Sequence, residues 1–254
     1  MIKYSWKSKY TLFSCILFLV LWEVIAVTIN NDIYLPRIEC ILKELLNLVK
    51  DKNFYMYVSS SFVRTLISYL CALVLSVFLG ILSSVYPFFK YLIAPLNSFV
   101  KTIPTLVLVV LALVWFDKDS APFIVGFAII FPILYEGIQN SLTKIDTKIM
   151  EMTVIYEVCI FDKIRKIYLP TIKFYIMNIF VSTLSLTFKV VIAGEVHGQP
   201  KYGIGSQIQL EKVNFNTTGI FAWILIIVLI SLVFEMINIK LNKTTYRWLN
   251  EDKH

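Results

Sequence analysis

Charged residues are scarce in this 254-residue chain: Asp, Glu, Lys and Arg make up 16% of it, whereas a soluble domain carries about 25%. Histidine is scarcer still, because only His197 and His254 occur, too far apart in the sequence to suggest a His-rich metal cluster. The four cysteines form no Cys-x-x-Cys pair, so we interpret them as ordinary small residues. With 58% hydrophobic residues, this composition excludes an ordinary soluble domain and indicates a membrane protein.

Motifs for nucleotide binding and catalysis are also absent. No stretch matches G-x-x-x-x-G-K-[ST], so the chain has no recognisable phosphate-binding loop for ATP. Neither H-E-x-x-H nor G-x-S-x-G occurs, and no histidine lies in an apolar run, which argues against a membrane-embedded enzyme. We therefore expect no catalytic residue, no metal and no cofactor, and chemical energy for pumping would have to come from a partner.

The hydrophobic residues are gathered in runs near 20 residues, the length with which an α-helix crosses a bilayer. We predict an all-α, polytopic membrane protein with about six transmembrane helices, organised as a single transmembrane domain over residues 1–254. The predicted spans are 10–30, 62–84, 91–115, 121–140, 170–195 and 219–239. The third contains Pro95 and Pro104, each of which can bend a helix. After Pro36, apolar residues from Ile38 to Val49 at spacings of three and four predict an amphipathic helix on the membrane surface.

Basic residues predict the orientation of the spans. With the N-terminus inside, thirteen of the 24 Lys and Arg residues fall on the cytoplasmic side and seven on the outer side, as the positive-inside rule favours. We therefore place both termini in the cytoplasm. We interpret the net charge of +7 as a topology signal and expect no nucleic-acid partner. The first apolar run is long for a signal peptide and contains Glu23, so we interpret it as an uncleaved span.

One long polar interval, about residues 141–170, interrupts the apolar runs, and its second part reads EMTVIYEVCIFDKIRKIYLP. Apolar residues recur through it at helical spacing, which predicts two short amphipathic helices. The expected faces are Ile145, Ile149, Met152 and Tyr156 on one helix and Ile160, Ile164 and Ile167 on the other. An apolar ridge with charged edges suits a groove in a partner protein. The alternative is a solvated loop whose apolar residues pack on the helix bundle.

This interval resembles the coupling motif of permease subunits of bacterial ABC importers, which reads E-A-A, three residues, G, nine residues and I-x-L-P. The residues at the matching positions are Glu151, Ile167, Leu169 and Pro170. The departures are Met152 and Thr153 in place of the alanines and Glu157 in place of the glycine. Because that glycine allows a sharp turn between two short helices, Glu157 leaves the local turn geometry open.

Other stretches extend the resemblance over nearly the whole chain. They are Leu35-Pro36, Lys101-Thr102-Ile103-Pro104, Trp115-Phe116, Ala193-Gly194-Glu195 and Gly203-Ile204-Gly205. Together they look like the nitrate/sulfonate/taurine branch of these permeases. The resemblance implies a type I importer fold in the bacterial inner membrane, a permease homodimer, two cytoplasmic ABC ATPase subunits and an extracytoplasmic substrate-binding protein. In this family the binding protein largely selects the substrate, so sulfonates, nitrate and thiamine precursors all stay open.

Charges within predicted spans are costly and therefore call for a reason. We regard Lys101, Lys189 and Glu195 as candidates for the translocation path or its gate. Either lysine could attract an anion in the path, or it could pair with an acidic residue of another span. Glu195 precedes a loop in which Gly203 and Gly205 are expected to allow movement, so gating and a structural pairing are both open there.

The principal alternative is an ion-coupled carrier that works without a motor subunit. Such a carrier would show a charged relay near the middle of the membrane and often internal repeats. No clear repeat is visible in the sequence, so we favour the ATP-driven importer.

Overall fold

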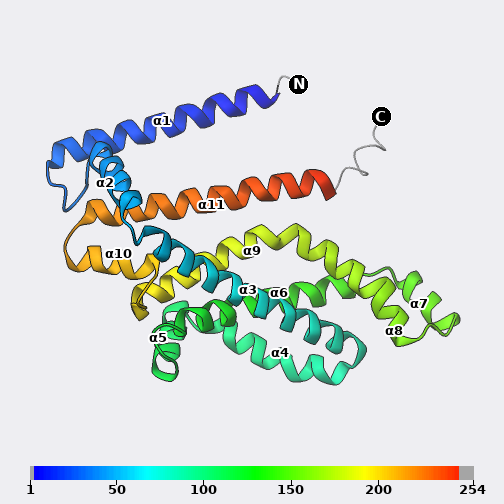
Figure 1. The fold of residues 1–254 in the computed structure, drawn as a ribbon. Coiled ribbons are helices and arrows are strands. Elements are labelled where there is room, and N and C mark those ends of the chain that lie inside the picture. Colours follow the sequence, from blue (N-terminus) through cyan, green and yellow to red (C-terminus); the bar gives the residue numbers. More distant parts are fainter. Residues whose placement is uncertain (1–2, 246–254) are drawn as a thin grey trace. The chain divides into compact units, whose positions relative to one another are not determined.

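The computed structural model describes residues 3–245, and most of them are helical (Figure 1). The elements are α1 (Lys3–Ile29), α2 (Ile38–Lys50), α3 (Phe54–Val85), α4 (Pro87–Thr102), α5 (Thr105–Trp115), α6 (Ala121–Thr143), α7 (Thr147–Ile155), α8 (Ile160–Lys163), the π-helical η1 (Ile164–Tyr168), α9 (Leu169–Gly198), α10 (Ile204–Val213) and α11 (Thr217–Thr245). The described residues contain no strand, and the predicted all-α class is confirmed. They form two compact units: residues up to Tyr55 with Gln207–Leu229, and Met56–Ser206 with the residues from Ile230 onward.

The first unit joins the end of α1 to the start of α2. The indole Nε1 of Trp22 donates to the carbonyl of Pro36 at 3.1 Å. The backbone N–H of Ile38 donates to the carboxylate of Glu23 at 3.1 Å. Glu23 thus satisfies one of the amides that the first turn of a helix leaves unpaired, which gives this charge in an apolar run a structural reason. α2 is the predicted amphipathic helix, and Leu42 on its apolar face is exposed.

In the second unit, a buried stripe of small residues runs along α3. It consists of Ser61, Thr65, Ser68, Ala72, Ser76, Gly80 and Ser83. The Ser68 hydroxyl donates to the carbonyl of Phe123 on α6 at 2.5 Å, and the Ser76 hydroxyl donates to a second α6 carbonyl at 3.2 Å. Because small side chains let helix backbones approach closely and hydroxyl groups bind across the contact, this stripe holds α3 against α6.

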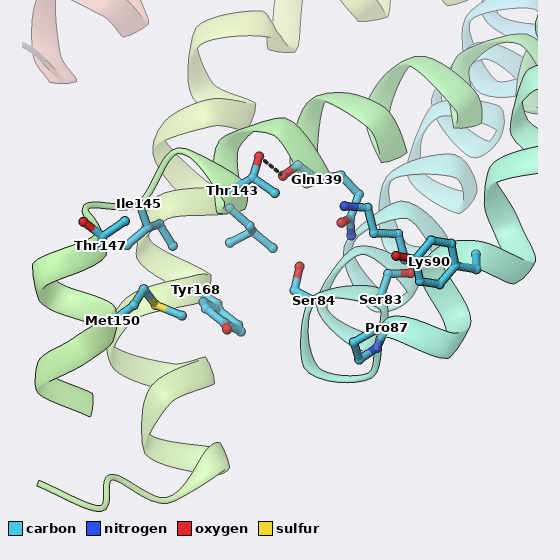
Figure 2. A pocket seen from close by; sticks show the side chains of 12 residues that line it. Ser83, Ser84, Pro87, Lys90, Gln139, Thr143, Ile145, Thr147, Met150 and Tyr168 are labelled. Carbon is cyan, nitrogen blue, oxygen red and sulfur yellow. Dashed lines mark hydrogen bonds between the residues drawn. The ribbon is translucent and has the colours of Figure 1, made fainter. Parts of the chain in front are cut away.

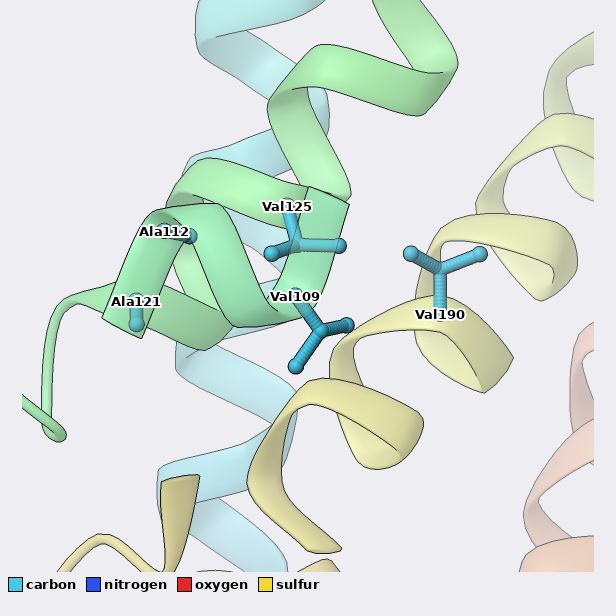
Figure 3. Close-up of a cluster of buried hydrophobic side chains, with 5 residues drawn as sticks. All are labelled: Val109, Ala112, Ala121, Val125 and Val190. Atoms are coloured by element: carbon cyan, nitrogen blue, oxygen red, sulfur yellow. The ribbon is translucent and has the colours of Figure 1, made fainter. Parts of the chain in front are cut away.

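Helices α5, α6 and α9 meet in a small apolar cluster. Its buried members, drawn in Figure 3, are Val109, Ala112, Ala121, Val125 and Val190. Beyond this cluster, α6 and α9 approach so closely that a Cβ on Gly194 would lie 2.9 Å from the Cα of Pro122. The close crossing of α6 and α9 therefore depends on a residue without a side chain at position 194.

Four helices in the described part of the chain are long and apolar enough to cross a membrane: Phe54–Val85, Ala121–Thr143, Ile160–Gly198 and Thr217–Ile237. The pair α4 and α5 gives a fifth candidate if it counts as one bent span, while the apolar part of α1, Phe13–Ile29, is shorter. The predicted number of six spans is therefore not confirmed. The orientation of the termini stays a prediction, and some of the basic residues on which it rests, such as Arg247, lie outside the described residues.

The predicted third span, 91–115, is not one helix. It divides into α4 and α5, which are bent by 105° at the break between them. Ile103 is extended, with φ −74° and ψ 126°, because the α region is disfavoured for a residue before proline. Pro104 also lacks the N–H that would continue the helix, whereas Pro95 stays within α4. The predicted loop after Glu195, which contains Gly203 and Gly205, likewise includes an unexpected helix, α10.

Candidate functional site

The polar interval forms two short helices, as its periodicity predicts. The carboxylate of Asp146 accepts from the backbone N–H of Lys148 at 2.9 Å and caps the start of α7. The second helix, α8, is four residues long and continues through η1 into α9 as part of one candidate span. We call residues 147–163 the α7–α8 segment.

The turn between α7 and α8 has the hydrogen bonds of a Schellman motif. The N–H of Val158 donates to the carbonyl of Thr153 at 2.9 Å, and the N–H of Glu157 donates to that of Val154 at 3.1 Å. Glu157 has a φ of 49°, in the left-handed region that the motif requires at this position. The sharp turn therefore forms without glycine, although a left-handed conformation costs a residue with a side chain roughly 1–2 kcal/mol.

One side of the α7–α8 segment packs on the helix bundle. Met150 of this segment lies against a buried cluster of Ile138, Leu142, Tyr168 and Ile172, as do the flanking residues Ile145, Ile164 and Ile167. Thr153 is also buried, and its hydroxyl donates to the carbonyl of Met150 at 2.7 Å. The expected second face is thus divided, because Ile164 and Ile167 pack inward while Ile160 is exposed.

The other side of the α7–α8 segment exposes four large apolar side chains around the turn. Val154, Ile155, Tyr156 and Phe161 are 74, 75, 73 and 71% exposed. We call these four residues the apolar tip. Glu151 and Met152 are exposed beside it. The helical periodicity did not predict that Val154, Ile155 and Phe161 would belong to this exposed surface. Periodicity assigns side chains to a face within one helix, whereas the turn between α7 and α8 determines which side chains of the two helices lie close together. Val154, Ile155 and Tyr156 lie outside every candidate span, whereas Phe161 is the second residue of the candidate span Ile160–Gly198. An exposed apolar surface of this kind marks a contact with another protein or with the membrane.

The last residues of the motif lead into a membrane span. Leu169 is the first residue of α9 and is partly exposed, and Pro170 occupies its first turn. Proline is well suited there, because the first N–H groups of a helix have no partner within it. The residues that match the motif therefore connect the exposed α7–α8 segment directly to the longest candidate span.

A second site is centred on the carboxylate of Glu195, which is completely buried. One carboxylate oxygen accepts from the hydroxyl of Ser61 at 2.6 Å and from the N–H of Gly205 at 3.0 Å. The other oxygen accepts from the guanidinium of Arg64 at 2.8 Å. Because a buried charge persists only when it is paired and hydrogen-bonded, these contacts explain why the carboxylate is tolerated. Glu195 faces these partners rather than open space.

Arg64 extends the contacts of Glu195 to two loops. It donates to the carbonyl of Tyr202 at 2.6 Å and to the carbonyl of Asp119 at 3.2 Å. The carboxylate of Asp119 lies 3.5 Å from the guanidinium and accepts from the N–H of Lys201 at 3.1 Å. The contacts join α3, the α5–α6 turn and the loop that follows α9. The Glu195 network, as we call it, consists of Ser61, Arg64, Asp119, Glu195 and Gly205.

Two glycines near Glu195 provide space rather than left-handed backbone. A Cβ on Gly203 would lie 2.7 Å from the Glu195 carboxylate, and a Cβ on Gly205 would lie 2.6 Å from its Cβ. Neither glycine has a positive φ. Glycine is therefore required at these positions because the chain packs closely around the buried carboxylate, and not because of the loop movement expected from the sequence.

The three candidate charges of the spans do not come together. Lys101 forms an ion pair with Glu136 of α6, and both side chains are about half exposed. Lys189 is exposed on α9 and has no ion pair with any residue in the described range. The pairing of Glu195 with Arg64 escaped prediction because 131 positions separate the two residues. Within residues 3–245, no group of three His, Cys, Asp or Glu side chains could hold a metal ion.

Comparisons with known proteins all point to transport permeases. The sequence pattern of the family described as "Binding-protein-dependent transport system inner membrane component" matches residues 72–244. A protein of Methanocaldococcus jannaschii named as an ABC transporter permease protein is 26% identical over 222 residues, which are 85% of this chain and 83% of that protein. An aliphatic sulfonates transport permease protein, SsuC, of Bacillus subtilis is 22% identical over 251 residues, covering 98% of this chain and 90% of that protein.

Proposed function

Because the chain belongs to the family of binding-protein-dependent transport system inner membrane components, we propose that it is the permease subunit of an ATP-driven importer. In this proposal it forms the translocation path for a small solute that a binding protein delivers. ATP is hydrolysed in two separate ATPase subunits, since the sequence contains no phosphate-binding loop. The complex lies in a bacterial cytoplasmic membrane, with both termini of this subunit inside and a second copy of the chain completing the path.

The apolar tip is the observation that carries this proposal. Its four side chains are each more than 70% exposed, and three of them, Val154, Ile155 and Tyr156, lie outside the candidate spans. Burying an isoleucine or valine side chain contributes about 1.5–3 kcal/mol, so a partner with a complementary groove would bind this surface. In the proposed complex the ATPase subunit supplies that groove, and Glu151 and Met152 border the contact. The Schellman turn at Glu157 sets the angle between the two helices.

In this proposal, movement of the ATPase subunit is transmitted to the membrane helices through the α7–α8 segment. The α7–α8 segment packs on the bundle through Met150 and the buried Thr153, and it continues through Ile167, Leu169 and Pro170 into α9. A displacement of the apolar tip therefore acts on a long candidate span.

The charges within the spans take different roles in this proposal. Lys189 is exposed on α9, within a candidate span, and Lys101 is exposed on α4, which forms a candidate span only together with α5. In this proposal both lysines line the path. A charge facing lipid is costly, and a water-filled path or a second subunit removes that cost. Glu195 acts at the gate by holding the loop after α9 on α3 through Arg64.

The test uses the complex reconstituted with its ATPase and binding-protein subunits. Ile155→Glu places a charge in the proposed groove, and Glu151→Lys reverses the charge beside it. We expect each change to reduce ATP-driven uptake more than tenfold while the protein still inserts into the membrane, because about 1.4 kcal/mol of lost binding suffices. The matched control is Val213→Glu at the end of α10, where the side chain is 63% exposed and also lies outside the candidate spans. Uptake that survives Ile155→Glu would show that the α7–α8 segment does not couple.

A further inference from the structure

A cavity of about 440 Å³, lined by both polar and apolar side chains, lies in the second unit. It is bounded by the α3–α4 corner, the end of α6 and the start of α7. Figure 2 shows Ser84, Pro87 and Lys90 on one side of this cavity and Thr147 and Met150 on the other. The volume is in the range of small-molecule sites in proteins. The cavity belongs neither to the apolar tip nor to the Glu195 network.

The lining of the cavity carries one cation and no carboxylate. Lys90 is exposed and forms no ion pair within the described part of the chain. The nearby acid Asp146 does not line the cavity, and its carboxylate caps α7. An ammonium group that has no carboxylate partner beside a cavity is suited to an anion, because it offers three N–H donors and no acceptor.

Neutral donors line the same cavity as Lys90. Gln139 lines the cavity and gives one amide proton to the carbonyl of Gly80 at 2.6 Å, which leaves its second amide proton uncommitted. Tyr91 and Tyr168 also line it and bring two hydroxyl groups. One ammonium and several neutral donors are the combination that recognises an anion with several acceptor oxygens.

The surroundings of the cavity indicate which anion this is. Phe88 and Tyr91, beside Lys90 on α4, are 69% and 77% exposed, and Tyr86 at the α3–α4 corner is 52% exposed. Exposed aromatic rings at the ends of membrane helices are typical of the membrane–water interface. Phospholipid phosphates lie at this depth, and basic pockets between membrane helices bind anionic headgroups. We propose that the cavity is a binding site for a phosphate group, with Lys90 as its principal ligand.

Occupation of this site would link elements that line the cavity from different sides. A phosphate held by Lys90 of α4 would reach Gln139 of α6 and lie against Thr147 and Met150 of α7. The bound group would therefore fasten the start of α7 to the α3–α4 corner. Binding itself does not depend on whether α7 contacts an ATPase, so this site can exist even if the proposed coupling role is wrong.

The experiment separates two sources of the phosphate group, a soluble anion and a lipid headgroup. In the first arm the purified full-length protein is placed in nanodiscs of neutral phosphatidylcholine and titrated with inorganic phosphate, with chloride holding the ionic strength constant. In the second arm the nanodiscs contain phosphatidylglycerol, and native mass spectrometry counts the anionic lipids retained on the protein. The variants are Lys90→Met, Lys90→Arg and, as a matched control, Lys144→Met, an exposed lysine that does not line the cavity.

We expect saturable binding in at least one arm. In that arm Lys90→Met weakens binding at least tenfold, Lys90→Arg keeps it within threefold and Lys144→Met leaves it unchanged. A dependence on Lys90 only in the second arm assigns the site to a phospholipid, and a dependence in the first arm assigns it to a soluble phosphate. Binding that is absent from both arms, or that falls equally in Lys90→Met and Lys144→Met, overturns the proposal.

Discussion

The ion pair between Arg64 and Glu195 offers a quantitative test of the Glu195 network. Glu195 is fully buried and the Arg64 side chain is 16% exposed, so each charge depends on the other. Glu195→Gln leaves the guanidinium with only the half-exposed Asp119 carboxylate at 3.5 Å, and Arg64→Met leaves the Glu195 carboxylate with only the Ser61 hydroxyl and the Gly205 N–H. Removing one partner of a buried pair costs about 3–5 kcal/mol. We take about 3 kcal/mol for each variant, because the remaining hydrogen bonds offset part of the loss.

The double variant isolates the interaction energy between Arg64 and Glu195 from the contributions of their other contacts. When both charges are absent, no uncompensated charge is left buried, so we expect Arg64→Met with Glu195→Gln to cost about 4 kcal/mol rather than the sum of about 6. The coupling energy of about 2 kcal/mol is measurable by unfolding the purified protein reversibly in mixed micelles with a denaturing detergent. The control cycle uses Lys43 and Glu39, an i, i+4 pair whose side chains are 70% and 72% exposed, and we expect no measurable coupling there. Equal coupling in the two cycles, or a loss below about 1 kcal/mol for Glu195→Gln, would refute the reasoning.

Three further predictions concern the turn at Glu157, the close packing at Gly205 and the absence of a phosphate-binding loop. Glu157→Gly removes the cost of a side chain in the left-handed conformation and should raise the free energy of unfolding by about 1 kcal/mol. The control Glu44→Gly, within the ordinary helix α2, should lower the free energy of unfolding by about 0.5–1 kcal/mol. Chemical denaturation measures both changes. Gly205→Ala should lower the free energy of unfolding by about 1–3 kcal/mol, because the added Cβ would lie 2.6 Å from the Cβ of Glu195. The control is Gly198→Ala, whose added Cβ would lie 3.2 Å from the nearest atom, a leucine methyl group. A loss for Gly205→Ala that is no larger than the loss for Gly198→Ala would contradict this prediction. The purified subunit alone should hydrolyse no ATP in a phosphate-release assay, and turnover that persists in a preparation free of ATPase subunits would refute the assignment to a separate motor.

Local sequence signals predicted the parts of the fold that are set by neighbouring residues. Apolar spacing of three and four placed α2, and a polar interval with helical periodicity placed α7 and α8. Pro104 was expected to bend the third span, but the bend of 105° depends on where α4 and α5 find apolar partners. Val109 and Ala112 of α5 are buried against α6 and α9, and that contact is not encoded near the proline.

Contacts between distant residues could not be predicted. Nothing near Glu195 in the sequence indicates that Arg64 and Ser61 on α3 enclose it, so its complete burial was not foreseen. Glu157 shows a second limit. A family pattern with glycine indicates that a left-handed turn is needed, but it does not show whether another residue adopts that conformation when the hydrogen bonds of the turn compensate.

The most direct test of the coupling role uses a thiol that the protein already has. Cys159 is exposed at the turn of the α7–α8 segment, and replacing Cys15, Cys40 and Cys71 by serine leaves it as the only cysteine in the chain. A thiol-reactive photo-crosslinker on Cys159 is activated in the complex assembled with its ATPase subunits. The control carries Val213→Cys in place of Cys159. We predict a cross-link from position 159 to the ATPase subunit and none from position 213; equal or absent cross-linking from both positions would contradict the assignment of the α7–α8 segment as the ATPase contact.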